Sequence, residues 1–198
     1  MSGDQLSDIA GELVKASTRL HRLVDALPDR AWTLPPARGS WSVAQCVEHL
    51  NLTSRAFVPR LRDAVARAGP QPPGRAYRSD LAGRMVAGMV GPMLRMGRFR
   101  LGRVKTPAPF QPADAPPREP TMAEFDALQG QLLEIVRDAR GRAIGAVKVT
   151  SPFAEKLSYS VYAALIIIPR HQFRHLDQAE ESARLAGASV TGARETST

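Results

Sequence analysis

A proline-rich stretch near the middle of this 198-residue chain decides its fold: residues 106–120 read TPAPFQPADAPPREP. Six of these fifteen residues are proline, which lacks a backbone N–H and is excluded from helix interiors and central strands. In an extended form, at about 3.1 Å per residue, the stretch reaches about 45 Å, whereas a twenty-residue helix is only about 30 Å long. The stretch can therefore run back along a whole helical bundle and place its two flanking helices parallel to each other.

Four stretches on either side of this crossover have apolar residues three and four positions apart, which is the spacing of amphipathic helices. They are residues 6–27, 43–65, 121–141 and 158–185. The last of them contains a segment, 159–168, that is apolar on every side and should be the most buried part of the protein. Residues 146–150 are the one short strand candidate. The sequence therefore predicts an all-α fold, with a single domain over residues 1–187 and a frayed tail at 188–198.

Local signals predict where these helices begin and break. Ser42 and Gln45 form a capping-box pattern ahead of the second helix, and Thr121 and Glu124 form the same pattern ahead of the third. Two prolines lie inside helical patterns, where they are expected to kink, divide or interrupt the helix: Pro59 and Pro169.

Residues 80–104 form an irregular segment ahead of the crossover, so that 80–120 together make an irregular insertion. Four methionines at spacings of four, four and three residues indicate one soft apolar stripe on a helix: Met85, Met89, Met93 and Met96. Pro92 and the glycines of the same segment indicate that this helix is irregular. We interpret the stripe as packing, with a pocket mouth or a homodimer contact as the alternatives.

The composition is that of a soluble globular protein, with 43% hydrophobic and 23% charged residues. The single cysteine, Cys46, excludes an internal disulfide and a cysteine-based zinc cluster, and it fits a reducing compartment. No stretch approaches the ~18 to 20 apolar residues of a membrane span, and the first residues, MSGDQLSDIA, lack the pattern of a signal peptide. We therefore expect a cytoplasmic protein.

The net charge of +8 raises the question of a nucleic-acid partner. Nearly all the basic residues are arginines in a chain that is also rich in alanine, glycine and proline, as a GC-rich coding sequence alone would produce. The densest basic cluster comprises Arg95, Arg98, Arg100, Arg103 and Lys105. This cluster could contact phosphate, an anionic membrane or an acidic substrate, but we favour a solvated basic face. No nucleic-acid partner is expected.

Two of the four histidines have the spacing of metal ligands. His171 and His175 are four residues apart in a predicted helix, so their imidazoles share a face about 6 Å apart along the axis and can converge on one ion. Zincin metalloproteases place a glutamate directly after the first histidine as the general base. Here that position is Gln172, which excludes the zincin interpretation.

A third ligand is needed for a strong site, and His49 is the candidate. It lies one helical turn after Cys46, on the flank of the second helix's apolar stripe, where it can point into the seam with the fourth helix. His21 lies at the edge of the first helix's stripe and is interpreted as a boundary residue. For any single histidine, a hydrogen-bonded boundary position without a ligand is the competing interpretation. For Cys46 we favour a small buried apolar side chain over a ligand.

Three stretches resemble motifs of the DinB/YfiT-like superfamily. Residues 39–50, GSWSVAQCVEHL, match its W-S-x-x-x-x-x-x-H-L helix start. Residues 162–178, which contain both histidines of the pair and end in Leu-Asp-Gln, resemble its last-helix motif, and residues 110–112, Phe-Gln-Pro, resemble its crossover segment. The resemblance covers residues 6–185. Each motif is short, so the specificity comes from three histidines that occur in order on the expected helices.

The resemblance implies a four-helix bundle of up-down-down-up topology that holds a divalent metal, usually nickel or zinc and sometimes iron or manganese. Carried over residue by residue, the ligands would be His49, His171 and His175. Three histidines leave coordination positions open to water or substrate, as in catalytic metal sites. The resemblance therefore implies an enzyme that acts on a small-molecule substrate, with a non-catalytic metal-binding or stress-response module as an alternative.

Two reactions fit such a site. A metal-bound water, its pKa lowered toward about 7, can act as a hydrolytic nucleophile. A low-molecular-weight thiol such as mycothiol, bacillithiol or glutathione can instead bind as a thiolate and attack an electrophile; related branches resemble enzymes of both kinds. The sequence offers no obvious general base, because Glu48 points about 100° away from His49 around their helix. We therefore prefer transfer of a metal-activated thiol, with a metal-dependent hydrolase as the alternative.

Overall fold

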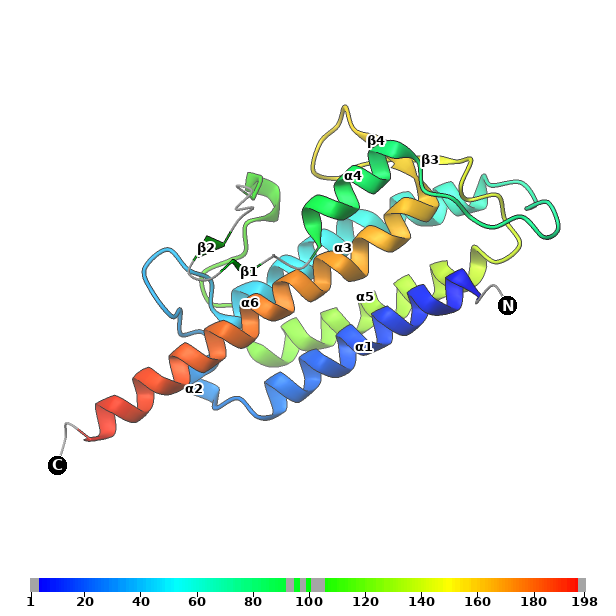
Figure 1. The fold of residues 1–198 in the computed structure, drawn as a ribbon. Helices are drawn as coiled ribbons and strands as arrows, with labels where there is room; N and C mark the ends of the chain where they lie inside the picture. The colour runs from blue at the N-terminus through cyan, green and yellow to red at the C-terminus, as the bar shows by residue number, and fades with distance from the viewer. Residues whose placement is uncertain (1–3, 92–94, 97–98, 101–105, 196–198) are drawn as a thin grey trace.

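The structure is a computed structural model that describes residues 4–91, 95–96, 99–100 and 106–195. Its four long helices are α1 (Gln5–Asp25), α3 (Val43–Ala66), α5 (Arg118–Asp138) and α6 (Val161–Glu195) (Figure 1). The short elements are α2 (Asp29–Trp32), α4 (Leu81–Val90), the 3-10 helix η1 (Ala108–Phe110) and four strands, β1 (Arg95–Met96), β2 (Phe99–Arg100), β3 (Lys148–Thr150) and β4 (Ser158–Ser160). Within these described parts, none of the helices is both long enough and apolar enough to cross a membrane.

The four long helices run in two parallel pairs. Between α3 and α5 the residue numbers of contacting partners rise together, as only parallel helices allow: Asn51 with Thr121, Arg55 with Glu124, and Arg62 with Glu134. The same order holds between α1 and α6: Gln5 with Tyr162, then Arg19 with Glu180. Figure 1 shows the α3–α5 pair running opposite to the α1–α6 pair. The predicted up-down-down-up bundle with its long proline-rich crossover is therefore confirmed.

The predicted start of α5 is wrong by one turn. The helix begins at Arg118, its N-cap is Pro117, and no side chain caps it, so the capping box of Thr121 and Glu124 does not form. Pro120 fits the first turn because the N–H groups there have no partner inside the helix. Thr121 is already helical and buried, and the carboxylate of Glu124 instead accepts hydrogen bonds from the Arg55 guanidinium on α3. The last proline of the proline-rich stretch, Pro120, therefore lies in the first turn of α5 and not in the crossover.

α6 differs from its prediction at both ends. Residues 158–160, predicted as helix, form strand β4, which pairs antiparallel with β3, so the strand candidate at 146–150 is real and the helix begins at Val161. The helix then continues to Glu195, where we expected it to end at 185 and the tail from 188 to be frayed. The segment 159–168 is deeply buried, as predicted, apart from Ile166, which is partly buried.

Neither internal proline divides its helix. Pro59 lies within α3 and Pro169 within α6, and both helices are continuous through them. A proline removes one backbone hydrogen bond from a helix. Residues of both helices on either side of their prolines are buried in the core, and this packing outweighs the local loss. At its N-terminus, α3 has the capping box of Ser42 and Gln45 that the sequence predicts.

The two methionines of the stripe whose side chains are described, Met85 and Met89, do not pack in the core. α4 ends at Val90, and Met85 and Met89 on it are 63% and 60% exposed. The opposite face of α4 lies so close to α6 that a Cβ atom added at Gly83 would sit 2.2 Å from the Cβ of Ala163. The basic cluster and the remaining methionines fall in residues 92–105, whose side chains lie outside the described residues.

The apolar core is divided into two clusters along the bundle. One contains the N-terminal part of α1 and the C-terminal part of α3, with residues up to Ile168 on α6. The other contains the C-terminal part of α1 and the N-terminal part of α3, and it resumes on α6 at Leu176. Buried polar residues lie between the two clusters: His49, Asn51, Thr53, Ser54, Gln129, Gln172 and His175. The candidate site therefore lies in a polar layer across the middle of the bundle.

Candidate metal centre

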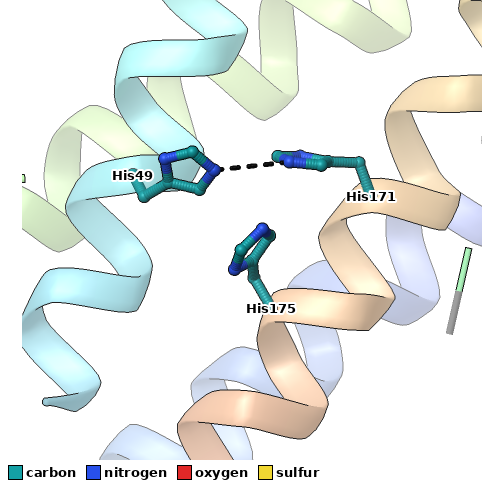
Figure 2. A group of neighbouring side chains, drawn as sticks. All are labelled: His49, His171 and His175. Carbon is teal, nitrogen blue, oxygen red and sulfur yellow. Dashed lines mark hydrogen bonds between the residues drawn. The ribbon is translucent and has the colours of Figure 1, made fainter. Parts of the chain in front are cut away.

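Three histidines from two helices converge in this polar layer. His49 points inward from the second turn of α3, and His171 and His175 face it from consecutive turns of α6 (Figure 2). One ring nitrogen of each lies within 4.8 Å of the other two, and the Nε2 atoms of His49 and His171 are 3.3 Å apart. Among the described residues, these three histidines form the one cluster of three or more histidine, cysteine or acidic side chains that is close enough to hold a metal ion. The structure thus brings together all three histidines that the sequence singled out.

A backbone carbonyl of the crossover orients His49. The Nδ1 atom of His49 lies 2.7 Å from the carbonyl oxygen of Phe110, in η1. Because a carbonyl oxygen only accepts, Nδ1 carries the hydrogen and donates it, which leaves the lone pair on Nε2, the atom that faces His171. Histidine ligands of metals are commonly held by such a bond from the second ring nitrogen. The crossover therefore fixes the ring in the tautomer that a metal ligand needs.

All three imidazoles are neutral at pH 7. Burial lowers the pKa of His49 to about 4, against the opposing effect of its hydrogen bond to Phe110. Burial lowers the pKa of His171 to about 3, with smaller contributions from His49 and Arg174. For His175 burial again dominates and holds the pKa well below its ordinary range. A neutral imidazole keeps a lone pair available to a cation.

A pair of glutamines holds α6 at the level of the histidines. Gln172, between the two histidines in sequence, is 1% exposed and faces α5. Its Nε2 donates to Oε1 of Gln129 at 2.9 Å, and Nε2 of Gln129 donates back to Oε1 of Gln172 at 3.2 Å. Since Gln172 lies about 100° around the helix from His171, this reciprocal pair keeps both histidines turned toward α3.

Aromatic side chains surround the histidine rings. The Trp41 ring centroid lies 4.9 Å from that of His49 and 5.8 Å from that of His175, and the Trp41 carbonyl accepts a hydrogen bond from Ser182 of α6. On the other side, Phe153 lies 5.8 Å from His171. Phe153 is in the loop between β3 and β4 and belongs to no motif, so its place beside His171 could not be predicted from sequence.

The other sequence candidates lie away from the histidines. His21 is a surface residue, 43% exposed, with Nε2 2.8 Å from a carboxylate oxygen of Asp126. Cys46 is 1% exposed, and burial raises the pKa of its thiol, as suits the favoured apolar interpretation. Glu48 has Glu124 and Arg55 as its electrostatic neighbours, so it faces away from His49 as predicted.

The three nitrogens fit a transition-metal ion. Two nitrogen ligands about 2.1 Å from one ion lie about 3.0 to 3.4 Å apart at ordinary coordination angles, and the two Nε2 atoms of His49 and His171 already have this separation. The Nδ1 atom of His175 is buried and, among the described residues, has no hydrogen-bond partner, so its lone pair or hydrogen is not committed to another protein group. Imidazole donors suit zinc, nickel and iron and do not by themselves choose among them.

Comparison with known proteins places this chain in a family. The family model of the DinB superfamily matches residues 12–179. A solved structure with the same fold is that of YfiT from Bacillus subtilis, described as "a probable metal-dependent hydrolase with an unusual four-helix bundle topology". The two sequences are 17% identical, and the structural alignment covers 94% of this chain and 90% of the YfiT chain, with a TM-score of 0.59. Among curated proteins, none matches. With its family model spanning most of the sequence, the chain belongs to the DinB superfamily.

Proposed function

We propose that this chain is a metal-dependent enzyme acting on a small molecule, with His49, His171 and His175 holding one divalent transition metal. The observation that carries this proposal is the convergence of three neutral imidazoles, one of them fixed in its tautomer by the Phe110 carbonyl. Three protein ligands leave coordination positions open, which is typical of catalytic rather than structural sites. Nickel and zinc are the first candidates for the ion, then iron and manganese.

Hydrolysis is the reaction that we place first. It is supported by the likeness to YfiT, whose structure is described as that of a probable metal-dependent hydrolase. A divalent ion at this site would supply Lewis-acid chemistry, lowering the pKa of a small ligand that reaches it and polarising a carbonyl or phosphoryl oxygen.

The protein's own residues provide orientation and a dry wall. His49 keeps its Nδ1 hydrogen on the Phe110 carbonyl, so this ring stays a fixed ligand and takes no part in proton transfer. Trp41 and Phe153 offer apolar surface on two sides of the histidines. His171 is partly exposed, whereas His49 and His175 are 3% and 8% exposed. His171 is thus the most accessible of the three ligands, and we expect a substrate to approach from its side.

Thiol transfer stays as the second candidate, because one observation favours it. Within the described parts of the chain, the groups that hydrogen-bond to the three histidine rings or pack against them include no carboxylate. A site without a protein general base suits a thiol, which loses its proton readily when it binds a cation. The comparisons with known proteins do not support the preference for thiol transfer over hydrolysis that the sequence suggested.

Metal content is the first test. Protein purified without a histidine tag should carry about one transition-metal ion per chain, measured by plasma mass spectrometry. The double variant His171→Ala/His175→Ala should lose it, and His21→Ala, a matched change at the surface, should keep it. If wild type and double variant are both metal-free and added metal leaves the melting temperature of wild type unchanged, the proposal is wrong.

Turnover then separates the reactions. Metal-loaded protein is assayed against activated esters and amides, and against mycothiol, bacillithiol and glutathione paired with electrophiles, with the double variant as the blank. Hydrolysis without a thiol supports the first candidate, and turnover only with a thiol supports the second. No turnover in either panel by metal-loaded protein favours the non-catalytic metal-binding or stress-response module.

Three further expectations stay predictions. They are a cytoplasmic location, the lack of a nucleic-acid partner, and a homodimer formed through the methionine-rich segment. For the homodimer, the exposed Met85 and Met89 of α4 are the part of that segment whose side chains are described. Sedimentation velocity of wild type and of Met85→Gln/Met89→Gln tests it, since a dimer through this face should dissociate in the variant.

A further inference from the structure

A cleft lies on a different side of α6 from the histidines. It has a volume of about 530 Å³, within the range of about 300 to 1,000 Å³ that small-molecule sites occupy. Its walls come from the segment before α4, from α4 itself and from α6: Arg78, Ser79, Arg84, Ala87, Tyr162, Ile166 and Arg170. The α6 residues are four apart, and the last of them precedes His171 by one position. The cleft therefore opens about 100° around α6 from the metal centre.

Three of the residues that line this cleft are arginines. Within the described part of the chain, Arg78, Arg84 and Arg170 form no ion pair, and no carboxylate lines the cleft. Asp80, next to it in sequence, is already engaged: one carboxylate oxygen accepts from the backbone N–H groups of Gly83 and Ser160, and the other from Lys148. The cleft thus has a local charge of about +3 that the protein does not neutralise.

Some of the polar groups in the cleft are held in position. The Tyr162 hydroxyl accepts a hydrogen bond from Nε2 of Gln5 at 2.9 Å, which leaves its own hydrogen free for donation. The Tyr162 ring stacks on Tyr77, with centroids 5.4 Å apart. Nη1 of Arg170 donates to the Ala87 carbonyl at 3.4 Å, so this guanidinium is anchored at α4 while its other N–H groups stay available. The polar side chains of the cleft therefore all offer donors.

We propose that this cleft binds a small organic phosphate monoester. Guanidinium groups bind the oxygens of phosphate through paired N–H bonds, and the two negative charges of a monoester would offset most of the surplus positive charge. Ala87 and Ile166 give the cleft an apolar wall for the organic part of the ligand. The site uses none of the three histidines, so it does not depend on the proposed metal-dependent activity.

Calorimetric titration with phenyl phosphate at low salt tests the proposal, with inorganic phosphate and phenol as partial probes. Wild type should bind phenyl phosphate more tightly than inorganic phosphate and should not bind phenol. Arg84→Gln should weaken binding about tenfold or more, and Arg78→Gln/Arg84→Gln should abolish it. Arg30→Gln, the same change at exposed Arg30 on α2, should have no effect. Binding should weaken as salt rises.

Three results would overturn the proposal: no binding of phenyl phosphate at millimolar concentration, equal binding by wild type and the double variant, or an equal loss in Arg30→Gln. Sedimentation with phosphatidylglycerol vesicles distinguishes a lipid headgroup from a soluble ligand. Vesicle binding without phenyl phosphate binding would also overturn it. Metal content, measured on every variant, should be unchanged, so that failure here is separate from failure of the metal centre.

Discussion

The two nitrogens of His49 have different tasks. Nδ1 is bonded to the carbonyl of Phe110, and Nε2 faces His171. Spacing and family resemblance identified His49 as a ligand candidate from the sequence alone. They could not show that a carbonyl of the crossover orients it, because a backbone group carries no residue signature. The same holds for Phe153, which reaches His171 from a loop that no motif marks.

Replacing Gln172 should be costly, although its side chain does not face the histidines. Gln172→Leu leaves the amide of Gln129 buried without its main partner, which costs roughly 1 to 3 kcal/mol of unfolding free energy. The double variant Gln129→Leu/Gln172→Leu removes both amides and should recover most of that loss. Urea denaturation of wild type, Gln129→Leu, Gln172→Leu and the double variant measures these changes in unfolding free energy. A double variant as unstable as the sum of both single variants would show that the amides do not act as a pair.

The thiol of Cys46 should be inert in the folded protein. It is 1% exposed, and burial raises its pKa, so little thiolate is present and a reagent cannot reach it. Titration with a disulfide reagent at pH 8 should detect no thiol in native protein and one per chain in guanidinium chloride. Rapid reaction of the native protein would instead place Cys46 at a surface or at an open site.

At the scale of elements, patterns predicted the helices better than their ends. The buried stripes of α3 and α5 are those that apolar spacing predicts. The start of α6 differs because residues 158–160 lead without a break into the apolar run of the helix, yet they pair with β3, a partner that only tertiary structure supplies. The start of α5 was missed because prolines were assigned wholly to the crossover, although the first turn of a helix accepts them.

Gly83 should be needed for α4 to pack against α6. A methyl group in Gly83→Ala would lie 2.2 Å from Ala163 Cβ, so the variant should lose about 1 to 3 kcal/mol of stability through overpacking. Gly88→Ala is the matched control on the same helix: its added Cβ meets nothing within 4 Å, and it should gain up to about 1 kcal/mol. Thermal melts compare them. Equal effects of the two changes would contradict the close contact.

Asp80 should make stability depend on pH. Burial would raise its pKa, but hydrogen bonds from Lys148 and from the backbone of Ser160 and Gly83 outweigh it, so the pKa is lowered below 3.8. A lowered pKa means that the stabilisation is fully present above the unfolded value and disappears as pH falls from about 4 through the folded value. At pH 7 the unfolding free energy of wild type should exceed that of Asp80→Asn by roughly 1 to 2 kcal/mol, because the hydrogen bonds to the carboxylate are charge-assisted. Denaturation from pH 7 down to pH 2.5 should show that difference vanish below pH 4; a constant difference would exclude the charge as its cause.

At the scale of the whole molecule, the fold should not need the metal. Each of the two apolar clusters draws on all four long helices, and the polar layer lies between them. Chelator-treated protein should therefore keep its helical circular dichroism and melt cooperatively. Metal at 100 times its dissociation constant should raise the unfolding free energy of wild type by about 2.7 kcal/mol, and its melting temperature with it. The melting temperature of His171→Ala/His175→Ala should not change. Loss of helicity on chelation would show that the ion is structural.

The parallel arrangement of α3 and α5 also sets an order of events during folding. No hairpin can bring these two helices together, because the chain must first close a loop that includes α4 and the whole crossover, and closure of long loops is entropically costly. The Phe110 carbonyl reaches His49 only once that loop has closed. In stopped-flow refolding, we therefore expect the capacity to capture a cation to emerge with the slowest kinetic phase, after most of the helical signal has already returned.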